Sequence, residues 1–345
     1  MKRQRWLSLF LAAALSVGLL AGCGAPAEPT STPEAASPAP SASEPSETSA
    51  QRTKVNLAML NGPTGMGAAK LIADAAAGTT LNDYNVQVAS QPTDLTAKLN
   101  TGEVDIAALP TNVAASYYNK TGSIQMLALN TLGVLYLLEN GTSVNTLADL
   151  KGQTLYATGQ GANPEYVLDY LLTLNGVDPD TEVDIQWKTS EEVQALMVSG
   201  EAKLAMLPVP AATGVLMQNS DVRAAIDFNT AWDEAGAEGT FTMGCVVVRN
   251  EFLEENPQAV EDFLTEYAAS IEYVRDNPEE AAPLVVEAGI VPKEPIALAA
   301  IPQANLVCIT GSDMLSIRDY YTVLYNANPD SIGGANPDDA FYYLP

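Results

Sequence analysis

Histidine is absent from the 345-residue chain. This absence removes the most common general base and a frequent metal ligand, so histidine-dependent catalysis is excluded. Cysteine is scarce as well, because only Cys245 and Cys308 occur besides Cys23. Two cysteines without histidine make no convincing zinc site. We therefore expect no metal, no cofactor and no enzymatic activity, and we leave open whether Cys245 and Cys308 form a disulfide or remain two buried thiols.

Positive charge is also in short supply. The chain has 16 Lys and Arg against 42 Asp and Glu, which gives a formal net charge of −26. Such a field repels nucleic acid and anionic membrane surfaces, so we expect neither as a direct partner. An anionic ligand would need local hydrogen-bond donors. Long apolar runs are lacking too, since the one at Trp6–Leu20 is short for a membrane span.

That apolar run belongs to an N-terminal targeting pattern. It follows Lys2, Arg3 and Arg5 and precedes "LAGC" at residues 20–23, which resembles the lipobox of bacterial lipoproteins. We predict that residues 1–22 are a signal peptide, that Cys23 is lipidated, and that the protein is anchored at the extracellular face of the cytoplasmic membrane. Loss of the three basic residues would change the net charge from −26 to −29. The alternative is an ordinary signal peptide with a chance cysteine.

The next segment has the composition of a disordered tether. Residues 24–51 consist of Pro, Ser, Thr, Ala and Glu with almost nothing else, and they contain no large apolar side chain. Such a segment cannot bury enough surface to offset the entropy lost on ordering. We assign 23–52 as a tether, with a glycosylated stalk as the weaker alternative.

From Lys54 onward, strand and helix patterns alternate. The first half predicts strands at 54–60, 84–89, 104–109 and 124–130, with helices at 68–78, 92–102 and 110–120. The second half predicts strands at 153–157, 183–187 and 202–207, with helices at 165–176 and 208–218. In the second half, Thr189 and Glu192 have capping-box spacing, and Asn163 is expected to cap a helix whose first position is Pro164. This alternation predicts an α/β protein with parallel sheets covered by helices on both faces.

One motif occurs twice. "GEVDIAALP" at 102–110 returns as "GEAKLAMLP" at 200–208, an offset of 98 residues that holds without a gap from Asp94/Glu192 to Asn119/Met217. A 98-residue unit is too long for a solenoid repeat and has the size of a domain core. We predict two similar units whose strand ends face each other across a ligand site, because ligands bind at the carboxyl edges of such sheets. The alternative is chance similarity between common strand and helix boundaries.

Several segments resemble the solute-binding lipoproteins of ABC importers, in the nitrate, sulfonate, taurine and thiamine-precursor branch. The segments are "LPTNVAASYYNK", "LALNTLGVLYLLENG", "GEAKLAMLPVPAATGVL" and "NPQAVEDFLTEYAASIEYVRDNPEEAA". The resemblance implies a type II periplasmic-binding-protein fold with lobe 1 at 53–133 plus 241–345 and lobe 2 at 134–240. It also implies a two-strand hinge that closes over a solute, and the permease subunits of an ABC importer as partners.

Candidate ligand-binding residues follow the expected strands of both lobes. For each loop the alternative is a structural turn or cap without a ligand. In lobe 1 and at the hinge the candidates are Asn61, Gly62, Pro63, Thr64, Gly65, Pro110, Thr111, Asn112, Asn130, Thr131, Thr240 and Thr242. In lobe 2 they are Gln160, Gly161, Asn163 and Pro208. Trp232, in a polar segment, is a further candidate for the mouth of the site.

The candidate set contains no Lys or Arg. This lack favours a neutral or heterocyclic solute such as a pyrimidine, although backbone N–H groups and hydroxyls can also hold a sulfonate. Two other functions are the alternatives. A tethered sensor or scaffold has the same sequence features as an importer component. An enzyme of the thiamine-pyrimidine type needs a histidine, which this chain lacks.

Overall fold

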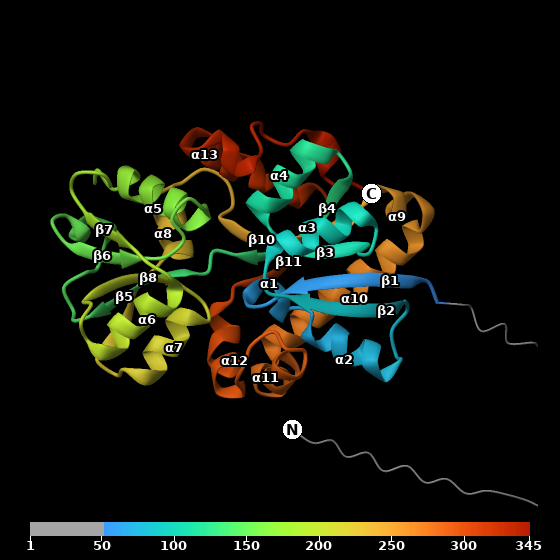
Figure 1. Cartoon of the computed structure of the whole chain (residues 1–345), viewed down its shortest axis with the longest axis horizontal. Coiled ribbons are helices and arrows are strands. Elements are labelled where there is room, and N and C mark those ends of the chain that lie inside the picture. The colour runs from blue at the N-terminus through green and yellow to red at the C-terminus, as the bar shows by residue number, and fades with distance from the viewer. Residues whose placement is uncertain (1–51) are drawn as a thin grey trace, which may run out of the picture. The chain divides into compact units, whose positions relative to one another are not determined.

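The structure is a computed structural model and describes residues 52–345, which contain two β-sheets (Figure 1). The first sheet comprises β1 (Lys54–Leu60), β2 (Asp83–Ala89), β3 (Ile106–Pro110), β4 (Ile124–Leu132), β10 (Thr242–Arg249) and β11 (Leu306–Thr310). The second comprises β5 (Leu135–Asn140), β6 (Thr154–Ala157), β7 (Asp184–Trp187), β8 (Leu204–Pro208) and β9 (Val222–Asp227). The predicted signal peptide, Cys23 and all but the last residue of the predicted tether lie outside the described residues.

Helices cover both faces of each sheet, which confirms the α/β class. Figure 1 shows α5 and α8 above the second sheet and α6 and α7 below it. The helices of lobe 1 are α1 (Pro63–Met66), α2 (Ala69–Ala77), α3 (Pro92–Thr101), α4 (Thr111–Thr121), α9 (Asn250–Glu255), α10 (Pro257–Asp276), α11 (Pro278–Glu287), α12 (Glu294–Ala300) and α13 (Ile317–Ala327). Those of lobe 2 are α5 (Asn163–Leu174), α6 (Ser190–Ser199), α7 (Ala211–Gln218) and α8 (Phe228–Glu234).

The 98-residue repeat is visible in the element boundaries and in the strand order. Helix α6 begins and ends 98 residues after α3, and β8 begins and ends 98 residues after β3. The order β2-β1-β3-β10-β4 in the first sheet corresponds to β7-β6-β8-β5-β9 in the second. The Thr189 and Glu192 capping box at the start of α6 is present as predicted. The duplicated motif therefore marks the same strand in two units of like topology.

The prediction of parallel sheets is correct for only part of each sheet. Strands β2, β1 and β3 are parallel, as are β7, β6 and β8. Strands β10 and β5 run antiparallel to their neighbours, because each enters its sheet from the other half of the molecule. β11 at the edge of the first sheet is also antiparallel to its neighbour. These strands form pairs over long sequence distances that local alternation does not reveal.

The chain passes between the sheets twice, and the two passages pack on each other at Gly133. A Cβ atom at Gly133 would lie 2.3 Å from Cδ1 of Phe241 on the return passage. The N–H of Gly133 donates to Oδ1 of Asn229 at 3.2 Å, and its carbonyl accepts from Nδ2 of Asn305. Asn305 has a φ of 44°, a left-handed conformation that asparagine tolerates better than most residues. The exact lobe boundaries stay a prediction, but the passages between sheets lie at these residues.

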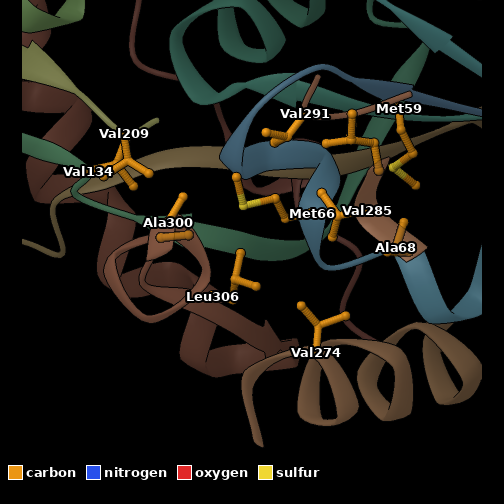
Figure 2. Close-up of a cluster of buried hydrophobic side chains, with 14 of the residues drawn as sticks. Met59, Met66, Ala68, Val134, Val209, Val274, Val285, Val291, Ala300 and Leu306 are labelled. Carbon is orange, nitrogen blue, oxygen red and sulfur yellow. The ribbon is translucent and has the colours of Figure 1, made fainter. Parts of the chain in front are cut away.

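An apolar core continues from one lobe into the other. Figure 2 shows Met59 and Met66 of lobe 1 in the same buried cluster as Val134 and Val209 of lobe 2. The N–H of Val209 also donates to the carbonyl of Val134 at 3.0 Å. The lobes are thus in apolar contact beside the hinge passages.

Trp232 is the largest fully buried side chain of the described residues, which corrects its expected place at the mouth of the site. It lies in α8 and is 1% exposed. Its ring stacks on Phe241 with centroids 5.4 Å apart and meets the edge of Tyr320 of α13 at 5.5 Å. Its Nε1 donates to the carbonyl of Gly239 at 2.9 Å. Trp232, Phe241 and Tyr320 therefore form a buried aromatic cluster at the hinge, and the polar segment around Trp232 packs over it.

The two described cysteines are free thiols, so the disulfide alternative is wrong. Cys245 lies on β10 and Cys308 on β11, with β4 between them. Two strand spacings amount to about 9–10 Å, beyond the roughly 7 Å that a disulfide allows between Cα atoms. Cys245 is fully buried, whereas Cys308 is half-buried.

Because both thiols are at least partly buried, we predict that they are labelled slowly and that Cys308 reacts before Cys245. Burial raises the pKa of Cys308 to about 11 and raises that of Cys245 further. Because the thiolate is the reactive form, Cys308 should react at pH 8 about 200-fold more slowly than an exposed thiol, and its rate should climb toward pH 11. Cys245 should react only after unfolding. Stopped-flow labelling of the C23S chain measures both rates, and equal, fast labelling in the native state would contradict the packing described here.

Among the described residues, no helix is both long enough and apolar enough to cross a bilayer.

Candidate functional site

The loop after β1 carries five of the predicted residues. Gly62 has φ 86° and ψ −159°, a combination that only glycine adopts readily, and its N–H donates to the carbonyl of Ile290 at 3.1 Å. Asn61 is exposed, and its Nδ2 donates to Oγ of Ser90 at 3.1 Å. Gly65 is buried, and a Cβ there would lie 2.0 Å from the carbonyl oxygen of Leu60. Residues Pro63–Met66 form the short helix α1, which packs on the end of β1.

The loop after β3 presents one accessible side chain and one buried side chain. Pro110 ends the strand and precedes α4, so Thr111 is the first residue of that helix. Oγ1 of Thr111 is buried and donates to the carbonyl of Thr242 at 2.7 Å. Asn112 is half-buried, and its side chain has no hydrogen-bond partner within residues 52–345. Asn112 therefore has an amide available for a ligand, whereas the Thr111 hydroxyl is engaged in the fold.

A buried polar network links the remaining predicted residues of lobe 1. Nδ2 of Asn130 donates to the carbonyl of Thr64 at 3.0 Å and to the hydroxyl of Tyr267 at 2.8 Å. Oγ1 of Thr131 donates to Oδ1 of Asn130 at 3.1 Å. The structure thus brings Thr64, Asn130 and Thr131 together, with Tyr267 from α10, which the sequence reasoning missed. These bonds give the side chains a role within the fold, and ligand contact by them stays a prediction.

The two predicted threonines at the return passage differ in burial. Thr242 is buried, and its Oγ1 donates to the carbonyl of Thr240 at 2.9 Å. Thr240 is half-buried, and its N–H donates to the carbonyl of Ser316 at 3.0 Å. Both residues therefore stabilise the second passage between the lobes.

In lobe 2, the loop after β6 corrects the predicted cap. Ala162 is the N-cap of α5, and Asn163 is the first helical residue. Asn163 is 3% exposed, and neither Nδ2 nor Oδ1 of its amide has a partner among the described residues. A buried amide without partners is costly, so this side chain is poised to accept a hydrogen-bonding group. Gln160 and Gly161 are exposed, and the N–H of Gly161 donates to the carboxylate of Glu165.

The corresponding loop after β8 contains two prolines, Pro208 and Pro210, which restrict its backbone. Pro208 ends the strand, and the following Val209–Pro210 peptide bond is cis. Pro210 is the N-cap of α7. Pro208 is half-buried and offers an apolar wall rather than a donor.

The helices α4, α5 and α7 follow these strand ends and start without side-chain caps. In α4 and α7 the first N–H groups, at the positive end of the helix dipole, lack an intrahelical acceptor and can donate to an acceptor group. In α5, Pro164 has no N–H and the N–H of Glu165 already donates to the carbonyl of Ala162 at 3.1 Å. Negative charge lies near α5, where burial together with Glu165 and Asp180 raises the pKa of Asp169 to about 6. The strand ends of both lobes thus offer amide and backbone donors, and none of the predicted residues is cationic.

Cavities elsewhere on the described residues do not coincide with these loops. Five cavities of about 250–500 Å³ on the described residues have no predicted site residue in their lining. The largest of these five is formed by the C-terminal ends of α3 and α4 together with Arg249. Among residues 52–345, no three carboxylate or thiol side chains gather as they would around a metal ion.

The comparisons with known proteins agree with this architecture. A family model described as NMT1/THI5 like matches residues 83–281, more than half of the chain. No curated protein matches the sequence significantly.

Solved structures share the fold at low sequence identity. An ABC transporter structure from Parabacteroides distasonis is 23% identical with a TM-score of 0.72, covering 84% of this chain and 99% of that one. The periplasmic aliphatic sulphonate binding protein SsuA from Escherichia coli is 14% identical with a TM-score of 0.66, covering 85% and 92%. The alkanesulfonate-binding protein SsuA from Xanthomonas axonopodis, bound to MOPS, is 11% identical with a TM-score of 0.59, covering 84% and 96%.

Proposed function

The chain belongs to the NMT1/THI5-like family, and on this premise we propose that it is a solute-binding protein that delivers a small organic solute to an ABC importer. The solute binds between the strand ends of lobe 1 and lobe 2, and rotation about the two passages near Gly133 and Phe241 encloses it. The permease subunits of the importer are the partners that receive it.

The duplicated strand-to-helix edge carries this proposal. In lobe 1, β3 leads into α4 at Pro110–Thr111, and in lobe 2, β8 leads into α7 after Pro208. Both helices start without a side-chain cap, so each lobe offers backbone donors at equivalent places. The partnerless amide of Asn163 in lobe 2 and the available amide of Asn112 in lobe 1 supply side-chain donors and acceptors. A molecule that bonds to both sets would favour the closed arrangement.

The chemistry of these groups favours a neutral or heterocyclic solute. An amide pairs a donor with an acceptor and therefore suits a ring that carries both, such as a pyrimidine. The candidate residues include no Lys or Arg for a bidentate grip on an anion. A sulfonate, the ligand class named for two of the structural neighbours, would be held by helix N-termini and hydroxyl groups instead.

We further propose that Cys23 is lipidated and anchors the protein at the extracellular face of the cytoplasmic membrane. The basic segment, the apolar run and "LAGC" support this location. The proline- and serine-rich residues 24–51 would then tether the folded part to the lipid. Mass spectrometry of the membrane fraction tests the proposal, because lipidation adds a diacylglycerol mass to a peptide beginning at residue 23.

A thermal-shift panel tests the binding function. Purified C23S protein would be melted with sulfonates, pyrimidines, thiamine, flavins, nitrate and bicarbonate. A ligand at 100 times its Kd stabilises the folded state by about 2.7 kcal/mol, which is easily seen as a rise in Tm. One responding class would support the proposal and name the solute. No response from any class at millimolar concentration would count against a small-solute function.

We predict that N61A, N112A and N163A separate binding from stability. Each side chain offers polar atoms at the proposed site, so each substitution should weaken binding of the responding solute by about tenfold or more. The apo protein should melt almost unchanged for N61A and N112A. For N163A it should melt unchanged or higher, since a buried amide without partners is removed. Titration calorimetry and apo melting measure the two effects, and equal losses of apo stability would support purely structural roles.

A further inference from the structure

Within the described residues, two hydrogen bonds between side chains join lobe 1 to lobe 2. Nδ2 of Asn328, which follows α13, donates to the hydroxyl of Tyr166 on α5 at 2.9 Å. Oγ1 of Thr213 on α7 donates to Oε1 of Gln303, in the turn Ile301–Gln303 after α12, at 3.2 Å. We call these the Tyr166 contact and the Thr213 contact.

Both contacts are shielded from water on the lobe 2 side. Tyr166 is 8% exposed and Thr213 is 1% exposed. The Tyr166 hydroxyl also donates to the carbonyl of Gly161 at 3.1 Å, so its bonding is complete in this arrangement. The carbonyl of Gln303 accepts from the hydroxyl of Tyr136 at 3.2 Å, which adds a second bond beside the Thr213 contact. Separation of these elements would expose the Tyr166 and Thr213 hydroxyls to water.

The contacts flank the hinge on opposite sides. Figure 1 shows α13 above and α12 below the region where the chain passes between the sheets. A rotation that moves lobe 2 away from α13 lengthens the Tyr166 contact. A rotation that moves it away from α12 lengthens the Thr213 contact. Opening of the lobes in either direction therefore breaks at least one contact.

We propose that the Tyr166 and Thr213 contacts form a latch that holds the lobes in the arrangement seen here without solute, and so sets how often they open to admit it. The inference rests on the proposed hinge function. Tyr166, Thr213, Gln303 and Asn328 act as positioning residues, because they shift the open-to-closed ratio. Affinity for a solute that needs the closed state depends on that ratio.

The test measures the distance between the lobes in the apo protein. Spin labels at A97C and A195C, exposed positions related by the 98-residue repeat, report on lobe separation by pulsed electron resonance. C23S and C308S remove the other accessible thiols. The latch variant is Y166F/T213V, which deletes the two hydroxyls. With two net hydrogen bonds lost, we expect the open-to-closed ratio to rise by about tenfold or more, visible as a new population at another distance.

The matched control is Y84F/T80V, which deletes a tyrosine and a threonine hydroxyl within lobe 1. The Tyr84 hydroxyl bonds to Asn82 and Glu266, and the Thr80 hydroxyl bonds to the carbonyl of Asn82. The control should keep the wild-type distance distribution. If the double latch variant does not fold, Y166F and T213V are measured singly, each with an expected severalfold rise.

An unchanged distance distribution in folded latch variants would overturn the latch. That outcome is distinct from failure of the proposed function, because the distance experiment uses no solute. A latch variant that opens while no solute class raises the Tm would keep the latch and reject the binding proposal. If a solute binds but the latch variants keep the wild-type distance distribution, the binding proposal is kept and the latch is rejected.

Discussion

Replacing Trp232 with alanine is expected to lower the free energy of unfolding by about 4 kcal/mol, the range found for large buried aromatics. The side chain is 1% exposed and contacts Tyr170, Phe241 and Tyr320, so its removal opens a cavity between lobe 2 and α13. It also leaves the carbonyl of Gly239 without its indole donor. For a folded part of this size the loss should reduce the Tm by about 8 °C.

Trp187 provides the matched control for this prediction. It ends the edge strand β7 and is half-buried, so W187A should cost clearly less than W232A. Urea unfolding followed by circular dichroism gives both free energies without relying on tryptophan emission. If W232A cost no more than W187A, the aromatic cluster at the hinge would not be the packing centre described here.

The second large effect is expected for Gly65. A Cβ there would lie 2.0 Å from the carbonyl oxygen of Leu60 and 3.5 Å from Ile290, so G65A forces α1 away from the end of β1. Overpacking of this kind costs about 3 kcal/mol, and here the clash is with backbone rather than with a flexible side chain. Because α1 follows Asn61 and Gly62, solute binding should be lost together with stability.

Gly214 in α7 separates the steric effect from helix propensity. Both glycines lie in helices, but a Cβ at Gly214 would have no neighbour nearer than 3.5 Å. G214A should therefore stabilise the protein by up to about 1 kcal/mol, the propensity difference between the two residues. Thermal melts of both variants provide the comparison. A stabilised G65A variant would show that α1 is not packed on β1 as seen here.

Local patterns predicted the regular elements well. The alternating residues 54–60 form β1 with the predicted bounds, and the helix predicted at 92–102 is α3, which ends one residue earlier. Glycines at 78, 102, 122 and 200 lie at helix ends in left-handed conformations, which glycine adopts readily. These features depend on neighbours a few residues apart, which a sequence shows directly.

Features that depend on distant partners were missed. Strand β10 lies antiparallel to β3, so that residues 244–248 pair with residues 106–110. No local sequence pattern indicates this pairing. Trp232 is surrounded by polar residues in the sequence, and its packing partner Tyr320 lies almost ninety residues further along the chain. Asn163 had the type and position of a helix cap, whereas the chain starts α5 at that residue and leaves its amide without a partner. The candidate site was predictable as strand-end loops, but the engagement of Asn130 with Tyr267 was not.

The central claim is that one small solute binds between the strand ends of the two lobes. A crystal structure of the protein with the solute found by the melting panel tests it most directly. The account predicts density that contacts Asn61 or Asn112 of lobe 1 and Gln160 or Asn163 of lobe 2 in the same molecule. Density confined to one lobe, or seated in the cavity beside Arg249, would contradict it.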